Sequence, residues 1–237
     1  MQSKELKNNK ITISSELVYL LGILILSFSV AMIASTNFGV SMIVAPAYIV
    51  SQKLGFITFG QSEYIIQGLL FIVFCLLMKR FKPIYLFSFM TSIIYGAVLD
   101  FWRLIIPHFN PSICPPGSLP LPLRIAYFAI GMLLTSLAVS LFFRTYIYPQ
   151  VYDFFVKCVS EKYNIDRTKF KMAFDGSMLI ISCILTLVLF HGFVGIGVGT
   201  IVMTALNGII IGFFGKIFDK YLVTKPTFTR LAKIFEV

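Results

Sequence analysis

The sequence predicts an all-α fold, a polytopic membrane helical bundle. Of the 237 residues, 58% are hydrophobic and 13% are charged, whereas about 25% of the residues of an average soluble chain are charged. Six apolar runs are also long enough to cross the hydrocarbon core of a bilayer, which takes about 20 helical residues. Water is therefore the wrong solvent for most of this surface, and a separate soluble domain has no room.

Six spans and two shorter stretches make up the expected helices. The spans cover approximately residues 16–35, 63–80, 84–106, 123–143, 172–191 and 194–218. The stretches 39–54 and 147–163 are too short or too polar to span, so we expect each to be a short re-entrant or interfacial helix. The 107–122 loop contains six prolines, which exclude a regular helix there.

Basic residues indicate the orientation, because short loops rich in lysine and arginine stay in the cytoplasm. If 39–54 and 147–163 do not cross, 17 of the 20 basic residues lie on one side, and only Lys53, Arg103 and Arg124 lie on the other. This arrangement predicts a bacterial plasma-membrane protein with both termini cytoplasmic. Eight spans would place Lys79 to Lys82 outside, against the rule.

An internal repeat is predicted from paired motifs. Gln67-Gly68 matches Asp175-Gly176 in the second helix of each half, and Gly96 with Asp100 matches Gly215 with Asp219 at the end of the third. Three spans in each half make the repeat inverted, an arrangement that recurs in secondary transporters. The alternative is chance similarity between two apolar, glycine-containing stretches.

The repeat gives the domain organisation. We expect a cytoplasmic N-terminal segment (1–15), a first three-helix repeat (16–106), a proline-rich outer loop (107–122), a second three-helix repeat (123–220) and a basic cytoplasmic tail (221–237). The tail is interpreted as a solvated topology signal, with partner or lipid binding as the alternative.

Several motifs together resemble the YczE/YyaS/YitT group of bacterial membrane proteins. These are Asn37-Phe-Gly39-Val-Ser41, Lys53-Leu-Gly55, the Gln67-Gly68 and Asp175-Gly176 pair, Gly197-Val-Gly199-Thr200, and the two Gly-x-x-x-Asp endings. The resemblance covers about residues 15–222 and implies a multi-pass plasma-membrane protein, with transport as one function and no named substrate. Arg144 to Pro149 replaces a glycine-rich segment of YitT-like members, so the YczE-like branch is more similar.

Candidate substrate-binding residues are polar side chains in or beside the spans: Ser41, Gln67, Thr91, Asp175, Thr204 and Asn207. Ionisable groups at membrane depth usually face a cavity or a partner, so Asp175 and its counterpart Gln67 would line opposite vestibules of one path. The alternative for Asp175 is a carboxylate that interacts locally with Lys171, one helical turn away.

Stripes of small and polar residues follow the third and last spans, where close packing is the more ordinary role. Thr91 and Asn207 reach further and are the better candidates for ligand contact. Gly39 and Ser41 are expected to open a short helix whose N-terminus offers amide groups to an anion, or else an interfacial helix. Asp100, Arg103 and Asp219 are interpreted as boundary anchors or gate residues, with local ion pairs.

Three functions remain open from the sequence. A transporter that moves a small solute or ion between two inverted halves is preferred; the alternatives are a substrate-binding subunit of an energy-coupled importer and a non-transporting accessory protein that binds a partner or lipid. No catalytic motif occurs, so we expect no enzyme, and we expect no cofactor, no metal and no nucleic acid. The four cysteines are interpreted as packing residues, and a homodimer or coupling complex is compatible with the sequence.

Overall fold

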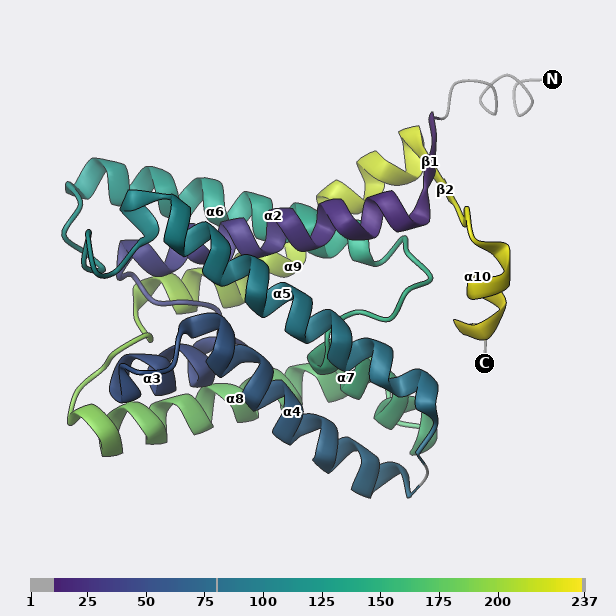
Figure 1. Ribbon diagram of the computed structural model, residues 1–237, viewed down its shortest axis with the longest axis horizontal. Coiled ribbons are helices and arrows are strands. Elements are labelled where there is room, and N and C mark those ends of the chain that lie inside the picture. Colours follow the sequence, from purple (N-terminus) through teal and green to yellow (C-terminus); the bar gives the residue numbers. More distant parts are fainter. Residues whose placement is uncertain (1–10, 80, 236–237) are drawn as a thin grey trace.

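Six long helices dominate the computed structural model, which describes residues 11–79 and 81–235 (Figure 1). They are α2 (Ser15–Thr36), α4 (Phe59–Met78), α5 (Leu86–Ile105), α6 (Leu121–Phe142), α8 (Arg167–Phe190) and α9 (Val198–Tyr221). Each is long and apolar enough to cross a membrane, α5 together with the preceding 3-10 turn η1 (Pro83–Tyr85). The six expected spans are confirmed.

The helix starts differ from the expected ones where the first turn is polar. α4 begins at Phe59, ahead of residue 63, because Thr58 and Gln61 form a reciprocal capping box. α8 begins at Arg167, ahead of residue 172, because the side chain of Asp166 accepts a hydrogen bond from the Lys169 amide. Caps let polar turns continue a helix beyond its apolar run.

Two short helices lie between the long ones. α3 (Ala45–Leu54) packs against α4 and α8, and α7 (Val151–Lys162) packs against α4, α8 and α5. The 147–163 stretch is expected from its sequence to form an interfacial helix on the lipid surface. This expectation is wrong for the apolar face of α7, because Val151, Phe154 and Val156 are buried among other helices. Whether α3 re-enters the membrane stays a prediction.

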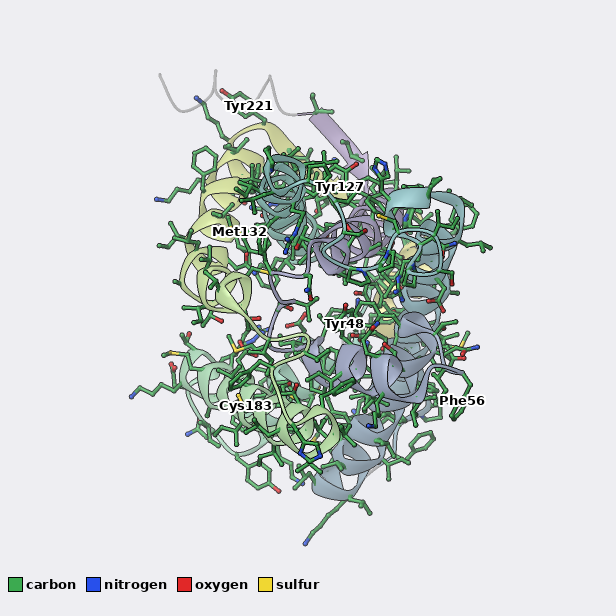
Figure 2. The ribbon with its side chains drawn as sticks, turned by 90° about the vertical axis from the view of Figure 1, so that its left-hand side faces the viewer. Tyr48, Phe56, Tyr127, Met132, Cys183 and Tyr221 are labelled. Carbon is green, nitrogen blue, oxygen red and sulfur yellow. The ribbon has the colours of Figure 1, made fainter. Side chains whose placement is uncertain are left out.

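The helices form two groups that α5 joins. α2, α6 and α9 pack side by side in one group, while α3, α4, α7 and α8 form the other (Figure 1). α5 packs against α2 in the first group and α4 in the second, but α9 packs against α6 and makes little contact with α8. Viewed along the long axis, Tyr48 lies between the group with Met132 and the group with Cys183 (Figure 2).

The long helices run alternately in opposite directions along the molecule (Figure 1). A parallel pair of short strands, β1 (Ile11–Ser14) and β2 (Leu222–Lys225), joins the two described ends of the chain at one end of the bundle. Near the opposite end, Lys53 donates to the carbonyl of Leu189. The described N- and C-terminal segments therefore lie on the same side, although residues 1–10 of the expected cytoplasmic segment are outside the described residues.

The C-terminal segment is docked, which the sequence did not indicate. After β2, α10 (Thr229–Phe235) places the Phe235 ring 4.9 Å from Tyr148 and 5.0 Å from Phe87, measured between ring centroids. The Glu16 carboxylate accepts from the amides of Thr227 and Phe228, each at 3.0 Å. The interpretation of 221–237 as a solvated tail is wrong, because aromatic packing and a charged acceptor hold the segment on the bundle.

The outer loop is irregular apart from one short turn. The 3-10 turn η2 (Pro107–Phe109) buries the Phe109 ring in the core, and Gly117 donates to the Ser35 carbonyl at 3.0 Å. The proline-rich loop is confirmed as helix-free between η2 and α6. Arg124, at the start of α6, donates to the Thr36 carbonyl at 2.7 Å, so the loop and α6 close over the end of α2.

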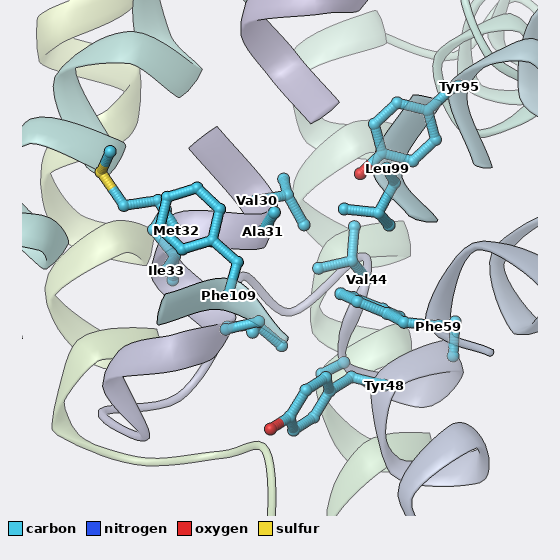
Figure 3. Close-up of a cluster of buried hydrophobic side chains, with 14 of the residues drawn as sticks. Val30, Ala31, Met32, Ile33, Val44, Tyr48, Phe59, Tyr95, Leu99 and Phe109 are labelled. Atoms are coloured by element: carbon cyan, nitrogen blue, oxygen red, sulfur yellow. The ribbon is translucent and has the colours of Figure 1, made fainter. Parts of the chain in front are cut away.

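Two large buried clusters and a small one, formed by Tyr19, Ile23 and Phe142, lie in the described interior. One large cluster surrounds Val44, Tyr48, Phe59, Tyr95 and Leu99 at the junction of α2, α3, α4 and α5 (Figure 3). The other large cluster is aromatic and joins α4 to α7, α8 and the docked tail.

The small-residue stripe of the third span is packed as expected, since Ser88 and Ser92 are fully buried. On α9 the stripe packs near its two ends, where Thr200 is buried and Gly215 lies beside Arg144 and Ser140. Between them, a Cβ atom at Gly208 or Gly212 would meet nothing within 4 Å, because these glycines line a cavity beside Ser140 and Arg144.

Candidate functional site: a buried carboxyl and amide cluster

Gln67 is the centre of a buried polar cluster. Its amide nitrogen donates to Gln150 Oε1 at 3.0 Å and to Glu63 Oε2 at 3.2 Å. Its amide oxygen accepts from Ser92 Oγ at 2.5 Å and from the Val151 amide at 3.1 Å. The Gln67 cluster is defined here as six buried residues: Glu63, Gln67, Ser92, Tyr95, Gln150 and Tyr152.

Local sequence explains how the cluster assembles. Glu63 and Gln67 are four residues apart on α4, so they share one helix face, and Ser92 and Tyr95 lie one turn apart on α5. Gln150 is the residue before α7. The first amide groups of a helix have no partner within it, and Gln67 accepts from that of Val151.

Several cluster atoms have no hydrogen-bond partner among the described residues. They are Glu63 Oε1, Tyr95 Oη and Gln150 Nε2, and Ser62 Oγ beside them is also unpaired. Tyr152 Oη reaches Glu63 Oε2 only at 3.4 Å, a long contact. Burying an unpaired polar group costs about 1–3 kcal/mol. A bound ligand that formed hydrogen bonds with these donors and acceptors would remove that cost.

Tyr152 is a proton donor in this setting. Its burial, followed by the nearby Glu63 carboxyl, holds the pKa of its hydroxyl well above the usual range. The hydroxyl therefore keeps its proton at physiological pH and faces the carboxyl as a donor. Within the described part of the chain, Glu63 forms no ion pair.

Thr91 adjoins the cluster from α5. Its hydroxyl lies 2.5 Å from Tyr19 Oη and 3.2 Å from the Tyr148 carbonyl, to which it donates. Tyr148 in turn lines a cavity of about 330 Å³ together with Tyr85, Lys157 and Cys158. The cavity lies at the end of the bundle where α4 ends, and Met78 also lines it.

The boundary residues are placed differently from expectation. Asp100 accepts from the Gly60 amide at 2.9 Å and from the Thr58 hydroxyl, at the N-terminus of α4, and it forms no ion pair with Arg103. The Arg103 guanidinium lies over the Phe59 ring at 5.5 Å. The expected local pair is therefore wrong, because the exposed amides that begin α4 attract the carboxylate.

Asp219 likewise pairs across helices. Its carboxylate lies 2.6 Å from the Arg144 guanidinium, just beyond the end of α6, a partner that the sequence did not indicate. Arg144 also donates to the Gly215 carbonyl. Asp219 thus connects α9 to α6, as a boundary anchor would.

Asp175 is not brought to the cluster. It lies 3.6 Å from the Lys171 ammonium, which also reaches Asp153 on α7 at 3.3 Å. This geometry agrees with the alternative in which Asp175 interacts locally with Lys171. A role for Asp175 in lining a vestibule stays a prediction.

Three further predicted residues lie outside the cluster. Ser41 accepts the amides of Val44 and Ala45 through its carbonyl, and α3 starts at Ala45, later than expected. Thr204 donates to the Thr200 carbonyl of its own helix at 2.8 Å. Asn207 accepts from Ser136 at 3.4 Å and so connects α9 to α6.

Four cluster residues escaped the sequence interpretation. Glu63 fell at the expected start of a span and was given no role; the earlier start of α4 places it one turn inside the helix. Gln150 and Tyr152 fell in a segment assigned to the lipid interface. Tyr95 resembled any apolar aromatic residue. The available signal was the i, i+4 pair of Glu63 with Gln67 in one apolar helix.

Fold and site together define the class: a multi-pass α-helical membrane protein with a buried carboxyl and amide cluster between its helices. The chain belongs to the family of unknown function DUF6198, which it matches over residues 13–216. It is also similar to the uncharacterized protein YyaS of Bacillus subtilis (strain 168), with 25% identity over 207 residues, which cover 87% of this chain and 95% of YyaS. No solved structure matches. The resemblance to the YyaS-containing group is confirmed.

Proposed function

We propose that this protein is a transporter that moves a small polar solute or ion across the membrane between two inverted halves. The observation that carries the proposal is the composition of the Gln67 cluster. Its residues come from α4 and α5 of the first half and from α7 of the second half. A site shared by two halves changes its surroundings when the halves move relative to each other.

The packing of the helices supports an inverted repeat. When each helix of the first half is exchanged with its counterpart in the second, α2–α5 packing becomes α6–α9 packing, and α3–α4 becomes α7–α8. α3–α8 likewise becomes α7–α4, and all of these pairs are in contact. Two pairs are exceptions: α4 and α5 pack closely whereas α8 and α9 do not, and α5 packs against α7 whereas α9 and α3 make little contact. In alternating access, two halves with the same helix contacts adopt two different conformations, one with its last two helices packed together and the other with them apart.

Orientation follows from the ends of the bundle. Lys162 donates to the carbonyls of Leu77 and Met78, so the α7 and α4 ends lie together with other basic residues. Lys53 and Arg124 lie near the opposite end. Together with the positive-inside rule, this distribution supports the proposal that both termini are cytoplasmic.

A second candidate is a substrate-binding subunit of an energy-coupled importer. The exposed face of α9 favours it, because only Gly199, Thr200 and Met203 of that helix are buried. Mild-detergent purification with chemical cross-linking distinguishes the two. Recovery with an ATPase and a membrane coupler supports the importer, whereas solute flux by the purified chain alone supports the transporter.

The direct test of transport is flux into proteoliposomes over a panel of radiolabelled amino acids, sugars, organic acids and inorganic ions. We expect at least one solute to enter faster than into protein-free liposomes, and Gln67→Leu to abolish that flux while the protein still elutes as a single species. A matched control is Ser182→Ala, which removes a buried hydroxyl that only bonds the Met178 carbonyl. Absence of flux across the panel would count against the proposal.

A further inference from the structure

Glu63 is a fully buried carboxyl group without a counter-ion. Its exposed fraction is 0%, its Oε1 atom has no partner, and its Oε2 atom has two neutral donors, Gln67 and Tyr152. An ionised carboxylate in the interior costs several kcal/mol unless it is paired and fully hydrogen-bonded. The neutral acid avoids most of this cost, so the closed arrangement suits a protonated Glu63.

The charged groups on the helices around Glu63 are engaged elsewhere. From α5, Asp100 bonds the start of α4 and Arg103 stacks on Phe59. From α3, Lys53 bonds the Leu189 carbonyl; from α7, Asp153 pairs with Lys171. The titratable groups that face the carboxyl are the tyrosine hydroxyls of Tyr95 and Tyr152.

In the second half, the residue that corresponds to Glu63 is charged and has counter-ions. The repeat offset that matches Gln67 with Asp175 matches Glu63 with Lys171. Lys171 has two carboxylates within 3.6 Å, those of Asp153 and Asp175. The chain therefore provides two carboxylate partners for the partly exposed Lys171 and no counter-ion for the fully buried Glu63.

We propose that Glu63 is an exchangeable proton site, whose carboxyl holds a proton while the cluster is closed and releases it to water when the cluster opens. The proposal rests on the proposed transport function and names its coupling ion. On closing, a proton from water adds to the carboxylate to form the O–H bond; on opening, that bond breaks and the proton returns to water on the side that is then accessible. One positive charge crosses with each full cycle of the carboxyl.

A metal cation fits the cluster less well than a proton. Alkali and alkaline-earth cations require several oxygen ligands, whereas the Gln67 amide nitrogen is directed at Glu63 and the Gln150 amide nitrogen is an unpaired donor in the same cluster. N–H groups repel a cation and stabilise a carboxyl or carboxylate oxygen. The tyrosine hydroxyls add donors of the same kind.

The test is infrared difference spectroscopy of the purified protein in lipid at pH 7, with exchange from H₂O into D₂O. The C=O stretching band of a protonated carboxylic acid is separate from the bands of a carboxylate. We expect this band in the wild type, its loss in Glu63→Gln, and its persistence in the control Glu161→Gln, which alters an exposed glutamate on α7. We also expect the band to shift in D₂O within minutes, as an exchangeable proton requires.

Three results would overturn the proposal: no protonated band in the wild type, a band that Glu63→Gln leaves unchanged, or a proton that fails to exchange over hours, which would make Glu63 a static buried acid. Replacing potassium by sodium should leave the band unaltered, and its loss in sodium would point to a metal site instead. If Glu63→Gln does not fold, Glu63→Asp, which keeps a carboxyl, should shift the band.

This measurement separates the two proposals, because it needs no transported solute. A protonated, exchanging Glu63 without any flux over the solute panel would leave the proton site standing and remove the transport function. Flux that is independent of the pH gradient in a protein whose Glu63 band is absent would keep the transporter and remove the proton coupling. Loss of pH-gradient dependence in Glu63→Gln, with residual downhill flux, is expected if both hold.

Discussion

At the scale of residues, the hydrogen-bond partner distinguishes a structural hydroxyl from one that organises the site. Ser92 and Ser182 are both fully buried serines in long helices. Ser92 donates to Gln67 and lies 3.4 Å from the Val151 amide, on another helix, whereas Ser182 bonds only a carbonyl of its own helix. The two residues look alike in sequence and differ in what their loss exposes.

We expect Ser92→Ala to lower the free energy of unfolding by about 1–3 kcal/mol, because it leaves a buried amide oxygen short of a donor. Ser182→Ala should cost less than about 1 kcal/mol, since the Met178 carbonyl keeps its helical partner. Thermal unfolding in detergent, followed by circular dichroism, compares the two variants. Equal destabilisation would show that the cluster bonds add nothing beyond burial.

The Cys158 thiol should react slowly with alkylating reagents. Its burial, and then the neighbouring Glu161 carboxylate, raise its pKa to about 11, and the thiolate is the reactive form. Compared with a peptide thiol of pKa about 8.5, its thiolate fraction at pH 7.5 is roughly 300-fold smaller. The rate should rise about tenfold per pH unit up to about pH 11.

The measurement uses iodoacetamide on a variant in which Cys75, Cys114 and Cys183 are alanine, with a short cysteine peptide as the reference. A rate that levels off between pH 8 and 9 would contradict the assignment. An alkylation rate that keeps rising up to about pH 11 would support a raised thiol pKa in the cavity beside Tyr148 and Lys157.

At the scale of elements, one close helix crossing contrasts with one open helix face. Gly60 and Gly96 bring α4 and α5 together so closely that a Cβ atom at either would overlap the carbonyl of the other. Gly212 on α9 has open space around its Cβ position. Glycines that appear equivalent in the small-residue stripes therefore have different roles.

Gly96→Ala should destabilise the protein by about 1–3 kcal/mol, because backbone cannot yield as a flexible side chain does. Gly212→Ala should be neutral or stabilise the helix by up to about 1 kcal/mol, as alanine does in a helix interior. Unfolding temperatures in detergent test the pair. Destabilisation by Gly212→Ala would mean that another surface covers α9 in the purified protein.

The docked α10 makes a prediction for the tail. Removing the Phe235 ring deletes its aromatic contacts with Tyr148 and Phe87, so Phe235→Ala should free the segment and make the peptide bond after Phe228, between β2 and α10, accessible to chymotrypsin. Cleavage should be faster by roughly tenfold for each 1.4 kcal/mol of docking energy lost. Lys233→Ala, an exposed change on the same helix, is the control and should leave the rate at Phe228 unchanged.

At the scale of the whole molecule, the unequal packing of the halves predicts a second state. The proposed repeat relates the close Gly60 and Gly96 crossing to Thr168 on α8 and Gly215 on α9, which are apart here because α8 and α9 scarcely touch. If the halves exchange states, α8 and α9 approach while α4 and α5 separate.

We expect a variant with Thr168→Cys and Gly215→Cys, free of other cysteines, to be cross-linked in proteoliposomes by a short bis-thiol reagent. Each single variant is the control for cross-links between molecules, and electrophoretic mobility reports the product. The absence of an intramolecular cross-link under all conditions would contradict exchange between the two states while leaving the fold unaffected.

The sequence by itself determined the six candidate spans, the irregular proline-rich loop and the packing of the stripe that contains Ser88 and Ser92. These follow from apolar length, proline content and the cost of polar groups in hydrocarbon, all of which are local. Helix starts were displaced where Thr58 and Asp166 supply caps, since a polar first turn looks like a connector until its capping bonds are known.

Only the tertiary structure decided which polar groups meet. Glu63, Gln150 and Tyr152 come together because α7 packs against α4 inside the bundle, and Asp175 remains with Lys171 because its side of α8 faces Asp153. Likewise, the docked tail and the β1–β2 pair join residues more than 200 positions apart. Hydropathy measures how well each segment suits lipid, but it carries no information about which buried surfaces are complementary, and that complementarity forms the candidate site.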